Sequence, residues 1–170
     1  MKLWSETSLA ELYSNTVGAF PGTSKRQNST DEVKIERLEW VPFRGMRTLF
    51  VKGSARREQS KNESIIVFKG VKYHGGRGRG LLEIAASNGE QVFLEPLSSG
   101  DTDVLVRCTC KDFHWRMTHF NKLDGSLFGR DRKKYEALYR PGSSNPSEAA
   151  CVCKHLIKMS KVLSEAGLLR

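Results

Sequence analysis

The sequence predicts an α+β fold, with a small antiparallel sheet between a short N-terminal helix and a helical C-terminal part. Short segments of β-branched and aromatic residues follow one another between residues 32 and 107. Apolar residues recur at helical spacing near both ends of the chain. Four residues that commonly ligate metals stand where the last strand and the last helix are expected: Cys108, Cys110, Cys153 and His155.

Length and composition are compatible with one continuous body. The chain has 170 residues, of which 38% are apolar, enough for a domain with its own core. No apolar stretch approaches the length that crosses a bilayer, so we expect no membrane partner. The net charge of +9 makes an acidic partner plausible, but the basic residues are spread along the chain, which is typical of solvated surface.

Residues 1–31 are expected to form a helix and a polar arm. Ser8 and Glu11 have the spacing of a capping box, so the helix is expected at about residues 7–16. Its apolar face consists of Leu9, Leu12 and Tyr13. Such a short helix is marginal in water by itself. It packs either on its own sheet or on a neighbouring subunit, and the polar arm at 18–30 favours the neighbour.

Residues 32–107 are expected to form the sheet. The predicted strands include residues 33–42, 49–51, 65–73, 82–84, 92–94 and 104–106. A break of alternation near Arg37 indicates a β-bulge. Asn88-Gly89 is the preferred pair for a two-residue hairpin turn. These features predict an antiparallel meander that is curled or closed as a small barrel.

Two clusters of basic residues are interpreted as solvent-exposed surface. The first is the tip Gly75-Gly76-Arg77-Gly78-Arg79-Gly80, which we expect to be a hairpin loop rather than a finger that touches phosphate. The second consists of Arg130, Arg132, Lys133 and Lys134.

Residues 108–170 are expected to hold two helices. Phe113, Met117 and Phe120 recur at helical spacing and predict a core-facing helix at about 112–122. The last helix is expected at about 154–165 and to stop at Gly167.

Two residue pairs in this part have the spacing of metal ligands. In an extended segment Cys108 and Cys110 point to the same side. Cys153 and His155 lie at a helix start, where free N–H groups favour a thiolate. Three thiolates and one imidazole suit a closed structural zinc site, so Zn2+ is the expected cofactor.

Other interpretations of the cysteines stay open at this point. Cys151 could replace a member of the second pair, and His114 is another spare ligand. The first residues lack the apolar core of a secretory signal, so we expect a cytoplasmic environment, which argues against disulfides.

The pattern Cys-x-Cys…Cys-x-His resembles the SWIM-type zinc finger, a short β-β-α module. The resemblance implies that Cys108, Cys110, Cys153 and His155 bind zinc and that the module serves DNA or protein contacts. It covers Cys108 to about Leu163. The 42 residues between the pairs exceed the usual spacing, so the insert must be a substructure or a long loop.

The surrounding residues are similar to small virion-associated proteins of tailed bacteriophages. The similar stretches are Cys-Thr-Cys-Lys-Asp-Phe-His-Trp-Arg, Arg140-Pro141, Asn145-Pro146 and Cys153-Lys154-His155-Leu156. This resemblance implies a structural component of a tail, baseplate or neck, located in the virion and bound to other structural proteins. The alternative is a SWIM-like nucleic-acid-binding protein that uses the basic residues.

No constellation of residues predicts catalysis. Four protein ligands leave a zinc ion no open position. Cys153 and His155 do not face each other as a nucleophile and its base must. Asp101 and Asp103 are explained by a turn before a strand. We therefore expect a non-enzymatic protein with no small-molecule substrate.

Overall fold

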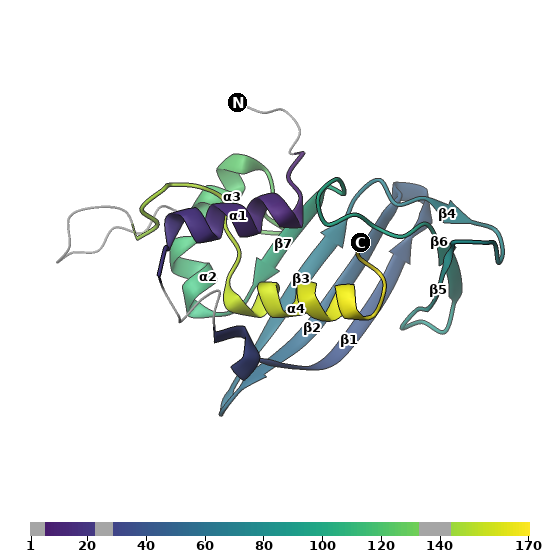
Figure 1. Cartoon of the computed structure of the whole chain (residues 1–170), viewed down its shortest axis with the longest axis horizontal. Helices are drawn as coiled ribbons and strands as arrows, with labels where there is room; N and C mark the ends of the chain where they lie inside the picture. The colour runs from purple at the N-terminus through teal and green to yellow at the C-terminus, as the bar shows by residue number, and fades with distance from the viewer. Residues whose placement is uncertain (1–5, 23–28, 133–143) are drawn as a thin grey trace.

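The computed structural model describes residues 6–22, 29–132 and 144–170. Its main sheet has four antiparallel strands, against which α4 (Lys154–Glu165) packs (Figure 1). The strand order is β1-β2-β3-β7. The strands are β1 (Lys34–Phe43), β2 (Thr48–Arg57), β3 (Ser60–Phe68) and β7 (Val104–Cys108). Strands β1 to β3 form the predicted meander, and the predicted bulge lies between Ile35 and Arg37.

The predicted closure into a barrel is wrong. Strands β1 and β7 lie at opposite edges of the sheet and do not pair. A closed barrel whose interior is filled by side chains typically has about eight strands. The outer edge of β7 is instead occupied by a short segment of the insert, because the N–H of Val106 donates to Ser126 and the N–H of Phe128 donates to Val106.

A second sheet of three short strands has the order β4-β6-β5. Its strands are β4 (Tyr73–His74), β5 (Leu82–Ala85) and β6 (Gln91–Leu94). The tip at residues 75–80 is therefore not a hairpin loop, because β4 and β5 flank β6 and do not pair with each other.

The connection between β5 and β6 is one residue longer than the predicted two-residue turn. Ala86 and Glu90 face each other, and the N–H of Gly89 donates to Ala86 at 2.9 Å. Gly89 has a φ of +83°, which is the left-handed conformation that ends a three-residue hairpin loop.

The α-helices of the described residues lie before the first strand or after the last one. They are α1 (Leu9–Ala19), α2 (Lys111–Arg116), α3 (Thr118–Asp124) and α4 (Lys154–Glu165), with 3-10 turns η2 (Ser29–Glu32) and η3 (Arg44–Met46). The prediction of α4 is confirmed. The single helix predicted at 112–122 is two helices with a break at Met117, where φ is −118° and the carbonyl of Phe113 accepts from both the N–H of Met117 and the hydroxyl of Thr118. None of the described helices is long and apolar enough to span a bilayer.

Helix α4 lies on one face of the large sheet (Figure 1). Gly53 of β2 makes the close approach possible, since a Cβ there would come within 3.1 Å of the sulfur of Met159. A glycine in the middle of a strand is otherwise unfavourable. The close packing of α4 on β2 therefore explains the glycine at position 53.

Helix α1 packs on its own chain, which is the first of the two alternatives predicted for it. Ser8 caps the helix as predicted, accepting from the N–H of Glu11. Leu12 is fully buried. Backbone bonds tie this part to the body, from Ala10 N–H to Ser99 and from Val104 N–H to Thr7. The apolar face of α1 thus contributes to the common core of buried residues, which also contains Phe68, Met159 and Leu163.

Candidate metal centre

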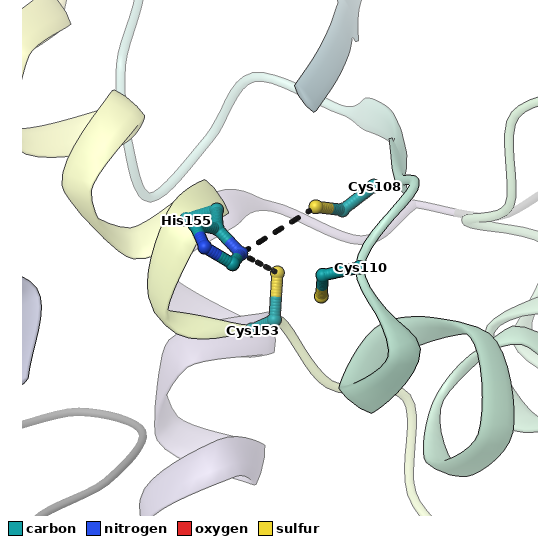
Figure 2. A group of neighbouring side chains, drawn as sticks. All are labelled: Cys108, Cys110, Cys153 and His155. Atoms are coloured by element: carbon teal, nitrogen blue, oxygen red, sulfur yellow. Dashed lines mark hydrogen bonds between the residues drawn. The ribbon is translucent and has the colours of Figure 1, made fainter. Parts of the chain in front are cut away.

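Four side chains converge where the end of β7 meets the start of α4 (Figure 2). Cys108 is the last residue of β7, Cys110 directly precedes α2, Cys153 directly precedes α4, and His155 lies in the first turn of α4. Their donor atoms all lie within 4.8 Å of one another. All four residues are buried, with at most 6% of their surface exposed.

The first pair owes its position to the sheet. Cys108 pairs with Ser64 in the ladder between β7 and β3. Beyond it, the N–H of Thr109 donates to Glu63 at 3.0 Å, and the N–H of Glu63 donates to the hydroxyl of Thr109 at 2.9 Å. The chain then turns into α2, where the sulfur of Cys110 accepts from the N–H of Phe113 at 3.3 Å. Cys110 thus caps the helix as a serine or aspartate would.

The second pair owes its position to the start of α4. Cys153 is the N-cap residue and has an extended backbone, and its carbonyl accepts from the N–H of Ile157. The imidazole of His155 turns back from the first turn. Its Nδ1 lies 3.7 Å from Sγ of Cys108 and 3.9 Å from Sγ of Cys153 (Figure 2).

The two distances from Nδ1 are close to those in a tetrahedrally coordinated ion. Donors at zinc–sulfur and zinc–nitrogen bond lengths stand about 3.6 to 3.8 Å apart along the edges of a tetrahedron. The Nδ1 of His155 is the nitrogen that faces the sulfurs, and its Nε2 is buried with no hydrogen-bond partner among the described residues. The four residues could therefore hold a metal ion through three sulfurs and Nδ1.

The thiols influence one another's ionisation. Hydrogen bonds from Cys110 and Cys153 hold the pKa of the Cys108 thiol well below its usual range, and the hydroxyl of Ser64 at 3.5 Å from its sulfur adds to this effect. Burial raises the pKa of the Cys153 thiol well above its usual range, and the neighbouring sulfurs raise it further. Full ionisation of this set therefore needs a compensating cation, as metal binding supplies.

The two alternative ligands lie outside the cluster. Cys151 is fully buried, and its sulfur lies 3.8 Å from the amide nitrogen of Asn145. The ring of His114 packs edge-on against Trp115, with centroids 4.8 Å apart. The structure thus brings together the four residues that the zinc-finger resemblance implies.

The basic clusters do not converge on the metal centre's ligands. Arg77 forms an ion pair with Glu83 at 3.1 Å. The guanidinium of Arg132 lies 4.3 Å from the ring centroid of Trp115, which is 42% exposed. Lys133 and Lys134 lie outside the described residues.

Sequence reasoning missed three buried polar residues around the centre: Thr16, Ser64 and Asn121. Each occupies a position where the local pattern expects an apolar side chain. Ser64 precedes the apolar run of β3, and Asn121 follows Met117 by one helical turn. A polar residue on an otherwise apolar face was the available signal.

Comparisons of the chain with protein families, with curated proteins and with solved structures found no match. The resemblances to the SWIM-type zinc finger and to bacteriophage virion proteins therefore stay predictions. The fold and the cluster by themselves define an α+β protein with a buried Cys3His group that could hold a metal ion.

Proposed function

We propose that this chain is a non-enzymatic structural or interaction protein, stabilised by one Zn2+ bound to Cys108, Cys110, Cys153 and His155. The observation that carries the proposal is the burial of all four donors between a strand end and a helix start. An ion there joins the sheet to α4 at the point where β7 ends and α4 begins. Structural zinc sites contribute to folding in this way.

The donor set favours zinc over other common ions. Three soft thiolates with one imidazole suit Zn2+, whereas Mg2+ and Ca2+ prefer oxygen donors. Four protein ligands complete a tetrahedron, and their burial keeps substrates away from the ion. A stabilising role therefore fits these residues better than a catalytic one.

The metal content of the purified full chain tests the site. We expect close to one zinc per chain by elemental analysis, and loss of that zinc in Cys110→Ser and in His155→Ala. Cys151→Ser is the matched control, because this buried cysteine lies outside the cluster and should retain zinc. A folded wild-type chain without affinity for zinc contradicts the proposal.

We propose that the protein is located in a bacteriophage virion, in the tail, baseplate or neck. The support is the resemblance of the residues around both metal-binding pairs, and the expected partners are other structural proteins. Quantitative mass spectrometry of purified particles tests this. A fixed copy number per particle supports the assignment, and absence from particles refutes it.

Nucleic-acid binding is the alternative function, and one observation favours it. Trp115 projects from α2 beside an open cleft of about 660 Å³, which it lines with Lys111, Asp112 and Arg116. Exposed aromatic and basic side chains together can stack bases and contact phosphates. In titrations of a labelled single strand, this function predicts affinity that falls with salt and weakens in Trp115→Ala. The structural role predicts no such binding.

A further inference from the structure

The extended segment at residues 150–153 delivers Cys153 to the metal centre without belonging to a sheet. Its four residues are buried, with at most 5% exposure. None of them lies in a helix or a strand. Buried backbone N–H and C=O groups need partners, so other groups must replace a β-ladder here.

Asn121 of α3 supplies two of these partners at Cys151. Its amide nitrogen donates to the carbonyl of Cys151 at 3.0 Å, and the N–H of Cys151 donates to its amide oxygen at 2.9 Å. Asn121 is fully buried. One side chain therefore satisfies both backbone groups of a residue two positions before Cys153.

Thr16 of α1 holds the next residue. The N–H of Val152 donates to the Thr16 hydroxyl at 2.9 Å. The same hydroxyl lies 2.8 Å from the carbonyl of Leu12 and 3.2 Å from that of Val152. A hydroxyl has one proton to donate. The shorter contact favours Leu12, so the bond that joins α1 to the segment is the one that Val152 donates.

We propose that Asn121 and Thr16 are positioning residues of the metal centre. They hold the backbone of Cys151 and Val152 so that the sulfur of Cys153 stands beside Cys108, Cys110 and His155 before an ion binds. This inference rests on the proposed zinc site. It links α1, at the other end of the chain, to the affinity for metal.

The physical basis is the conformational entropy of the segment. Ordering a backbone residue lowers its conformational entropy, and the free energy that this costs opposes binding. If the segment is ordered already, metal binding need not supply this free energy. Without the two side chains, part of the metal's binding free energy is spent on ordering residues 150–153, and the observed affinity falls.

Titration of Co2+ and Zn2+ into the full chain tests the role of Thr16. Thr16→Val keeps the shape and removes the hydroxyl, and it should weaken metal binding about tenfold, which is the low end of the effect of removing an outer-shell partner. Thr16→Ser keeps the hydroxyl and should restore affinity to within about threefold of the wild type.

Thr30→Val is the matched control. Thr30 is a buried threonine whose hydroxyl accepts from Lys161 at 3.0 Å, away from the four ligands. It should lower the melting temperature slightly and leave metal affinity unchanged. Equal affinity of Thr16→Val and the wild type overturns the inference, because a purely structural threonine would lower stability with and without metal alike.

Asn121→Leu and hydrogen exchange give an independent test if Thr16→Val does not fold. The variant removes both bonds to Cys151 and should weaken metal binding about 10- to 100-fold. In the metal-free wild type, the amides of Cys151 and Val152 should already be protected from exchange, and this protection should be lost in metal-free Asn121→Leu. Unprotected amides at both residues in the metal-free wild type overturn the inference, whereas a wild type that binds neither ion refutes the zinc site itself.

Discussion

The two halves of the metal centre are held in different ways. Cys108 and Cys110 continue a strand, and backbone hydrogen bonds to β3 determine where the chain goes. Cys153 follows a segment that is held by side chains from α1 and α3. A ladder can form wherever two strands pair, but the second half requires particular residues 30 and 136 positions away. From this difference we predict that the second half is the more sensitive to metal and to distant mutations.

Removal of the proposed zinc ion should produce the largest effect and should separate the two halves. With a chelator, we expect amide exchange at residues 150–157 to accelerate by about 100-fold or more, because metal binding is coupled to the order of this region. The amides of β7 at 104–108 should accelerate less, since β3 still pairs with them. Equal acceleration of both halves would contradict the comparison.

Truncation of a buried apolar side chain of α1 should have the next largest effect. Leu12 is fully buried in the common core, so Leu12→Ala should lower the free energy of unfolding by about 2–5 kcal/mol. Urea unfolding of the full chain measures it. Tyr13→Ala is the control. Because Tyr13 is 44% exposed, its truncation should lower the free energy of unfolding much less. A small effect at Leu12 would mean that α1 does not belong to the body.

A methyl group at Gly53 should have a smaller effect. Gly53→Ala places a Cβ 3.1 Å from the sulfur of Met159 and 3.4 Å from a methyl carbon of Leu38, so the side chain of Met159 must move by a few tenths of an ångström. We expect a loss of about 1–3 kcal/mol in urea unfolding. Gly45→Ala is the control, because a Cβ there meets nothing within 4 Å.

The smallest predicted effect is a gain of stability at the turn between β2 and β3, in the ladder that carries the first half. Glu58 has a φ of +51°, whereas Gln59 is not among the residues with positive φ. Glu58→Gly should therefore raise the free energy of unfolding by about 0.5–1 kcal/mol, because glycine adopts this conformation without strain. Gln59→Gly should lower the free energy of unfolding in the same assay. A loss at Glu58 would show that its side chain compensates for the strain.

Local patterns were sufficient for much of the fold. The spacing of apolar residues predicted α4 at its observed bounds, and the broken alternation predicted the bulge near Arg37. The candidate ligands were also identified from their types and spacing, and the resemblance to the SWIM-type zinc finger singled out the four that the structure brings together. These features depend on neighbours a few residues apart, which the sequence displays directly.

The residue pattern predicted which segments form strands, where the last helix lies and which residues are candidate metal ligands. The folded structure was needed to show that the sheet stays open, that α1 packs on its own chain and that Thr16 and Asn121 bond the segment before Cys153. This division follows from the range of the interactions. Propensity and periodicity act over one or two turns, whereas a buried hydroxyl or amide is satisfied by whichever backbone group the whole fold brings to it.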